Sequence, residues 1–202
     1  MTSNVLSADL VLDQTAQDVL FREARTASFT DEPVSDEQLR AIYDLVKYAP
    51  TSMNQQPLRV VLIRSDEARQ RLLAHLAEGN RAKTASAPVV AVLAADIDFH
   101  EELPRVFPHA PNAKDSFADE AAREATAKLN ATLQVGYFIL GVRAAGLAAG
   151  PMTGLDAEGI DREFFPDGRH RTLVVVNIGR PGENAWFDRL PRLDYDEVVT
   201  AV

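Results

Sequence analysis

The sequence predicts an α+β fold in which long helices pack on a small β-sheet. Three short apolar runs, at residues 58–63, 88–95 and 172–178, are rich in β-branched side chains and indicate strands. Residues 119–146 have one long helical pattern, and helices and strands do not alternate regularly. With 202 residues, 46% of them hydrophobic, the chain can bury one sizeable core, so we expect a single domain over residues 1–202.

The helices of the first third of the chain have recognisable ends. Residues 6–25 indicate a first helix, because their apolar side chains can share one side. Ser35 and Gln38 have the spacing of a capping box at the start of a second helix, which Pro50 ends. After the first strand, residues 65–78 predict a third helix with a serine N-cap.

The middle of the chain surrounds a central strand. The run at 88–95 is apolar on both faces, so we expect it to be covered on both sides. Residues 96–118 carry three prolines and predict an irregular segment, of a length often used as a lid or a contact with a partner. Glycines in the long helix predict close helix packing. A brief strand at 147–150 should then enter a turn at Pro151, followed by a short helix at 157–165.

Composition excludes several classes of function. The net charge is −9 and no basic stripe is present, which argues against nucleic acid and anionic membranes as partners. The chain has no cysteine, and its four histidines form no pair with metal-ligand spacing, so we expect no metal site. No signal peptide pattern and no long uncharged apolar run is seen, which predicts a cytoplasmic protein.

Neutral polar residues concentrate in one segment, Ala49-Pro50-Thr51-Ser52-Met53-Asn54-Gln55-Gln56-Pro57. Two hydroxyls and three amides between two prolines can offer donors and acceptors to one flat, heteroatom-rich ligand. Flavin mononucleotide is such a ligand. It needs cations or backbone amides for its phosphate, neutral groups for its ribityl chain, and a positive charge beside the edge of its ring that becomes negative on reduction.

This segment resembles the Ala-Pro-Ser-Ser-x-Asn-x-Gln-Pro loop of the nitroreductase superfamily, and the resemblance extends from Arg25 to the tail. Within the superfamily, the chain looks like the malonic semialdehyde reductase branch. Asn80 and Lys83 match an Asn-x-x-Lys element, and Pro151-Met152-Thr153-Gly154 matches a Pro-x-x-Gly turn. Many members have Glu where this chain has Thr153, a departure that leaves the local acid–base properties open and argues against a proton-donor role.

The resemblance implies an intertwined homodimer with a small mixed or antiparallel sheet and two FMN sites at the interface. Lys83 would stabilise charge at the flavin N1 and O2 atoms, with no other residue certain to be catalytic. The cofactor-binding residues implied in this way are Arg25, Thr26, Pro50, Thr51, Ser52, Asn54, Asn80, Lys83, Pro151, Met152, Thr153, Gly154, Arg189 and Arg192. The amino-terminal phosphate motif keeps only Arg25 and Thr26, so Arg192, or else Arg189, is expected to complete the phosphate pocket.

The function implied is hydride transfer in a ping-pong reaction, from NADPH or NADH to flavin N5 and then to an organic acceptor. For the branch named, the acceptor is malonic semialdehyde and the product is 3-hydroxypropionate. Arg105, His109 and Lys114 in the 96–118 segment could bind its carboxylate. Two alternatives stay open: a broad nitro- or quinone reductase on the same fold, and a non-catalytic flavin-binding protein. The preference between the two nicotinamide cofactors is not predicted.

Overall fold

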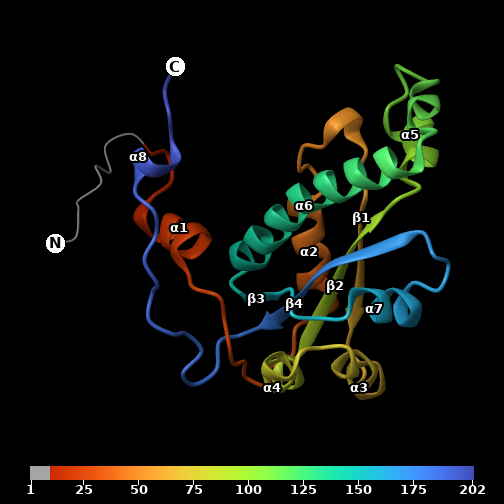
Figure 1. Ribbon diagram of the computed structural model, residues 1–202. Coiled ribbons are helices and arrows are strands. Elements are labelled where there is room, and N and C mark those ends of the chain that lie inside the picture. Colours follow the sequence, from red (N-terminus) through yellow and green to blue (C-terminus); the bar gives the residue numbers. More distant parts are fainter. Residues whose placement is uncertain (1–9) are drawn as a thin grey trace.

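The computed structural model describes residues 10–202 as a four-stranded antiparallel sheet surrounded by helices (Figure 1). The strands are β1 (Leu58–Ile63), β2 (Val89–Asp96), β3 (Ala148–Met152) and β4 (His170–Gly179). Their order is β1-β2-β4-β3, and each neighbouring pair is antiparallel. The predicted α+β class is therefore confirmed, with an all-antiparallel sheet.

The helices differ widely in length. The α-helices are α1 (Gln14–Gln17), α2 (Asp36–Val46), α3 (Asp66–Ala74), α4 (Glu78–Ser86), α5 (Leu103–Val106), α6 (Glu120–Ala144), α7 (Ala157–Phe164) and α8 (Tyr195–Val198). One π-helical segment, η1 (Asp18–Arg22), continues α1, and three short 3-10 segments are η2 (Ser52–Asn54), η3 (Phe99–Glu102) and η4 (Ala113–Phe117). The tail after β4 extends away from the sheet (Figure 1).

Strand β2 is central and buried along its whole length, as predicted. Its side chains alternate between two cores because successive residues of a strand point to opposite faces. One face packs against α2 and α6, and the other packs against α3 and α7. The residues of β2 in the first core are Val89, Ala91 and Leu93, and those in the second are Val90, Val92 and Ala94.

Helices α2 and α6 approach closely at one glycine. A Cβ atom built on Gly141 would lie 2.2 Å from Cγ1 of Val46, so only glycine fits there. A Cβ on Gly136 would meet nothing within 4 Å, and Gly146 lies beyond the helix with a φ of +73°. The expected role of glycine in helix packing is therefore confirmed at one of the three positions.

The first helix is shorter than predicted. Residues 6–9 of the predicted span lie outside the described residues, and α1 begins only after Asp13, whose side chain accepts a hydrogen bond from the Ala16 N–H group. The helical segment ends at Arg22 because the next residues become extended. There the N–H group of Thr26 donates to the carbonyl oxygen of Ala149 at 3.1 Å, which fixes this segment beside β3.

The helix predicted over residues 65–78 ends four residues earlier than predicted, and a second helix begins at Glu78. Helix α3 ends at Ala74, and α4 starts at Glu78. The polar residues 79–83, which include Asn80 and Lys83, are therefore helical. Tertiary pairing explains the break: the Ala77 N–H group donates to the Gly154 carbonyl oxygen at 3.0 Å, and Leu76 forms an isolated bridge with Leu155. No local pattern in the sequence reports these distant partners.

Two other predicted segments are more regular than expected. Residues 96–118 contain three short helical segments rather than an irregular loop, and they enclose a core in which Phe99 and Phe117 pack edge to face at 5.0 Å. Strand β3 continues through Pro151 to Met152, so the turn begins later than predicted. Proline is tolerated there because β3 is an edge strand.

Candidate functional site

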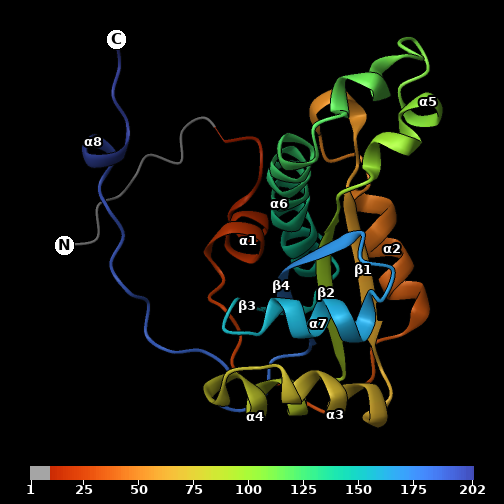
Figure 2. The same ribbon diagram turned by 45° about the vertical axis from the view of Figure 1, so that its right-hand side comes forward.

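The predicted site residues form two separate groups in the chain. We call the first group the basic site; its members are Arg25, Thr26, Asn80, Lys83 and residues 151–154. The second, the amide loop, comprises residues 50–57. The amide loop precedes β1 at one end of the sheet, whereas α4 precedes β2 at the opposite end (Figures 1 and 2). A single chain therefore does not bring the two groups together.

Helix α4 places two side chains of the basic site, and a third polar side chain, on one face. Asn80, Lys83 and Thr84 are spaced i, i+3 and i+4, which aligns them along a helix. The Asn80 side-chain amide donates to the Gly154 carbonyl oxygen at 2.9 Å, and the Thr84 hydroxyl lies 3.5 Å from the sulfur of Met152. The helix is thus fixed against the turn that follows β3.

The segment carrying Arg25 and Thr26 runs beside the edge strand β3, to which the Thr26 N–H group is hydrogen-bonded. A Cβ atom on Gly150 would lie 2.7 Å from the Thr26 carbonyl oxygen, so the missing side chain permits this close approach. Thr26 is fully buried, and its hydroxyl oxygen has no hydrogen-bond partner among the described residues. Arg25 is exposed. The segment therefore carries an exposed guanidinium next in sequence to a buried hydroxyl without a partner in the described part of the chain.

The electrostatics of the basic site favour a negatively charged ligand. Burial lowers the pKa of Lys83, and the positive charge of Arg25 lowers it further. Within residues 10–202, neither cation forms an ion pair with a carboxylate. Two cations that repel each other and have no carboxylate partner among these residues are suited to a negatively charged ligand.

Two further residues support the basic site and were missed from the sequence. Asn177 on β4 is fully buried, and its amide nitrogen donates to the Thr84 hydroxyl at 3.2 Å, one residue after Lys83. The sequence contained a signal for these two residues. Asn177 is a lone amide in the apolar run 172–178, and Thr84 is a hydroxyl on the same face of α4 as Lys83. Together they hold α4 against the sheet.

The amide loop is fixed by hydrogen bonds from three directions. The Ser52 N–H group donates to the side-chain carbonyl of Asn130 on α6 at 2.7 Å. The Asn54 side chain donates to the Val106 carbonyl oxygen at 2.7 Å, and the Thr51 hydroxyl accepts from the Gln56 N–H group at 3.2 Å. The side chains of Ser52 and Asn54 are exposed. The loop therefore presents neutral polar groups outward from a fixed backbone.

Two polar residues of α6 act as supports for the amide loop, although from the sequence they only interrupted an apolar run. Asn130 and Gln134 are 3% and 9% exposed. The Gln134 side-chain carbonyl accepts from the Leu58 N–H group at 2.9 Å, at the start of β1. Buried amides of this kind are usually hydrogen-bonded, and here their partners are the two ends of one loop.

The two tail arginines have different surroundings. Arg189 donates to the Arg22 carbonyl oxygen and lines a groove of about 640 Å³ between η1, the end of α6 and the tail. Arg192 donates only to the tail carbonyls of Leu190 and Pro191, at 2.9 and 3.0 Å. The structure thus places Arg189 against Arg22, which precedes Arg25 by three residues, but it does not bring Arg192 to the basic site within one chain.

A metal-binding cluster and a membrane-spanning helix are both absent from the part of the chain that the structure describes. Among residues 10–202, no cluster of three or more His, Asp or Glu side chains could hold a metal ion. Within the same residues, no helix combines the length and the apolar character needed to cross a membrane.

Comparisons with known proteins identify the family and agree with the fold. The model of the nitroreductase family matches residues 24–180. A Streptomyces coelicolor protein, provisionally named an NADH dehydrogenase/NAD(P)H nitroreductase, is 69% identical over 195 residues, which cover 96% of this chain and 99% of that protein. A Bacillus subtilis structure provisionally described as a nitroreductase has a TM-score of 0.84 at 21% identity, covering 92% of this chain and 98% of its own. A structure from Exiguobacterium sibiricum, provisionally described as a nitroreductase in complex with FMN, has a TM-score of 0.82 at 16% identity, covering 96% and 99%.

Proposed function

Because the chain belongs to the nitroreductase family, we propose that it is a cytoplasmic FMN-dependent NAD(P)H oxidoreductase. One observation carries the placement of the cofactor: α4, which carries Lys83, and the segment of Arg25 are both hydrogen-bonded to β3 or the turn that follows it, and neither cation forms an ion pair with a carboxylate within residues 10–202. When bound, FMN supplies the redox chemistry by passing a hydride from the nicotinamide to an acceptor. The chain supplies placement and charge.

Each part of the basic site has a role in this proposal. Arg25 and the Thr26 hydroxyl would bind the phosphate, with Arg192 or Arg189 completing its pocket. The Lys83 ammonium would stabilise negative charge at the edge of the flavin ring, as a fixed cation in a partly buried place can. The main chain of residues 151–154 would lie along the ring, with Asn80 holding Gly154 in place. Thr153 carries no carboxylic acid, so we assign it no proton transfer.

We place the completed site between two subunits. The amide loop and the basic site lie at opposite ends of one sheet, so the loop reaches a flavin only if that flavin is bound by another chain (Figure 2). Large apolar side chains are exposed at helical spacing on α6, and more are exposed along the tail, as expected of surfaces that a partner covers. On α6 these are Leu129, Leu133 and Tyr137. The proposed state is an intertwined homodimer with two shared sites.

Mixed dimers test this arrangement. Lys83→Gln damages the basic site and Asn54→Ala damages the amide loop, so each homodimer should have two defective sites. In a mixed dimer with sites shared between chains, one site combines both intact parts, and about half of the wild-type activity should return. Activity no higher than that of the two variants measured separately would contradict a shared site. Purified wild-type protein should be yellow, and anaerobic NADPH or NADH should bleach it.

The acceptor we propose is a small carbonyl acid such as malonic semialdehyde. Arg105 lines a polar cavity of about 400 Å³ together with Gln56 and Arg59, next to the amide loop. Guanidinium groups are suited to a carboxylate, although Arg105 is paired with Glu102 at 2.7 Å and must exchange that partner. His109 packs on Phe107, and Lys114 lies further along on η4.

Substrate kinetics distinguish this acceptor from the alternative, a broad nitro- or quinone reductase, which the name of the Streptomyces relative favours. If the carboxylate is recognised here, Arg105→Ala or Lys114→Ala should raise the KM for malonic semialdehyde and leave the KM for a nitroaromatic unchanged. Equal KM values in both variants and the wild type would remove this segment from substrate recognition. A yellow protein that neither nicotinamide cofactor reduces would instead indicate a non-catalytic flavin-binding protein.

A further inference from the structure

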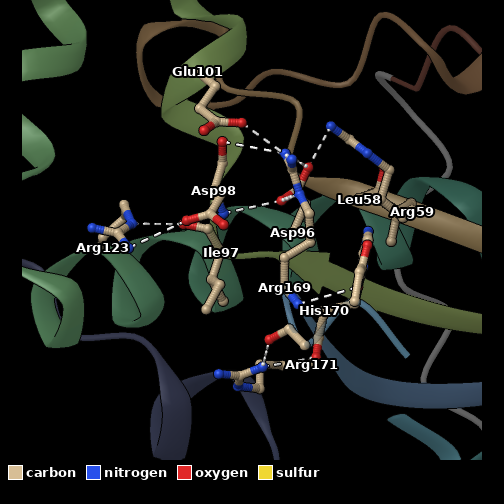
Figure 3. Close-up of polar contacts among 12 residues, drawn as sticks. Leu58, Arg59, Asp96, Ile97, Asp98, Glu101, Arg123, Arg169, His170 and Arg171 are labelled. Atoms are coloured by element: carbon tan, nitrogen blue, oxygen red, sulfur yellow. Dashed lines mark hydrogen bonds and ion pairs between the residues drawn. The ribbon is translucent and has the colours of Figure 1, made fainter. Parts of the chain in front are cut away.

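A buried carboxylate lies between two guanidinium groups at the end of β2 (Figure 3). Asp96 is 1% exposed. Arg169 donates from Nε and Nη2 to its two carboxylate oxygens, at 2.8 and 2.9 Å, and Nη2 of Arg59 lies 2.8 Å from Oδ2. Because taking charges out of water is costly, a buried ion cluster is weak support for stability as such. The cluster also contacts backbone groups at the start of β1.

Arg59 links this cluster to the amide loop. Its Nη1 atom donates to the carbonyl oxygens of Gln56 and Leu58, at 2.9 and 3.0 Å, while Nη2 contacts Asp96. The Asp96 N–H group also donates to the Pro57 carbonyl oxygen at 2.8 Å. The end of the amide loop is thus held by Asp96 in two ways, directly through the main chain and indirectly through the Arg59 side chain.

The amide loop needs such support because its backbone is strained. Met53, Asn54 and Gln56 have φ values of +51°, +51° and +45°. Side chains other than glycine rarely adopt this region, and they stay in it only where the surrounding structure imposes it. Within residues 10–202, residues 53–56 are the only stretch in which more than one non-glycine residue has a positive φ. Arg59 contacts the last of the three directly.

We propose that Arg59 and Asp96 are positioning residues that hold the amide loop in the strained conformation in which Ser52 and Asn54 reach the flavin. Arg169 contributes by fixing the Asp96 carboxylate, and it continues to Glu101 at 3.1 Å. Neither Arg59 nor Asp96 is assigned a contact with the flavin. Because Arg59 also lines the cavity proposed for the acceptor, its positioning role is tested by loop exchange and FMN affinity and not by the KM of the acceptor. The functional half of this proposal rests on the proposed function, whereas the structural half concerns the chain alone.

The variant Arg59→Gln removes the link and leaves the Asp96–Arg169 pair in place. Its matched control is Arg171→Gln, which breaks a comparable ion pair with Glu124 at 3.3 Å and does not touch the amide loop. The two arginine side chains are similarly exposed, at 35% and 30%. Asp96→Asn is a second test of the same link, with Arg59→Lys as the conservative variant, since a shorter cation can keep one of the contacts.

Hydrogen–deuterium exchange of the FMN-free protein is the first readout, and FMN affinity measured by quenching of flavin fluorescence is the second. In Arg59→Gln, exchange in residues 50–57 should accelerate by about tenfold or more, and the FMN Kd should rise by about tenfold, as expected when a charged group loses its hydrogen bonds. Exchange in α6 should stay as in the wild type. Arg59→Lys should recover part of both effects, and Arg171→Gln should show neither.

Wild-type exchange of residues 50–57 in both Arg59→Gln and Asp96→Asn would overturn the proposal. Faster exchange with unchanged FMN affinity would overturn its functional half, because the loop conformation would not matter for binding. Failure of the wild-type protein itself to bind FMN would instead overturn the proposed function. In that case the exchange of the FMN-free loop would still decide whether Arg59 and Asp96 hold it.

Discussion

The substitution Lys83→Gln tests whether the Lys83 ammonium group binds a ligand or stabilises the fold. In the protein without ligand, the ammonium group is partly buried and is repelled by Arg25, and both effects lower its pKa. Glutamine has a similar reach without the charge. Removing a charge from an unpaired, partly buried position should therefore leave the stability of the FMN-free protein unchanged or slightly higher.

The same substitution should weaken FMN binding. A hydrogen bond to a charged group contributes about 1.5–3 kcal/mol, which corresponds to about a 10- to 150-fold increase in Kd. FMN affinity can be followed by flavin fluorescence, and stability by thermal unfolding of the FMN-free protein. Lys128→Gln is the matched control, because Lys128 is also partly buried but is already paired with Glu124 one helical turn away.

Two results would refute this reasoning. If Lys83→Gln protein bound FMN with wild-type affinity, the ammonium would have no part in the site. If the FMN-free variant were markedly less stable than the wild type, Lys83 would have a structural role that its lowered pKa argues against. The expected signature is a change in affinity without a loss of stability, and the control variant should show neither.

The remaining predictions concern pH and helix packing. Because the pKa of Lys83 in the FMN-free protein is lowered from 10.5, the unfolded state binds more protons between the two values, so stability should rise with pH across that window. FMN affinity should fall over the same window as the ammonium loses its proton, and both slopes should flatten in Lys83→Gln. Gly141→Ala should destabilise the protein by about 1–3 kcal/mol in thermal unfolding, since the new Cβ would lie 2.2 Å from Val46. Gly136→Ala, in the same helix but with no atom within 4 Å, should instead stabilise it by about 0.5–1 kcal/mol, and a loss there would indicate that another chain covers this face.

Local signals in the sequence determined most of the elements. Strand β1 has the predicted bounds, Ser35 and Gln38 form the predicted capping box, and Asp119 caps α6. These features depend on the period of apolar residues and on hydrogen bonds between near neighbours. The residues of the basic site were named from the sequence through the family resemblance, and their contacts with a flavin stay a prediction.

Only the tertiary structure decided which of these residues meet. Helix α3 ends early because Ala77 pairs with Gly154, a partner far along the chain that no local pattern reveals. Asn177 supports α4 from another strand, and Arg59 and Asp96 meet only because β1 and β2 pair in one register. The amide loop and the basic site lie at opposite ends of the sheet because β1 and β2 pair antiparallel, and the direction of this pairing is set by the tertiary structure and not by local propensity.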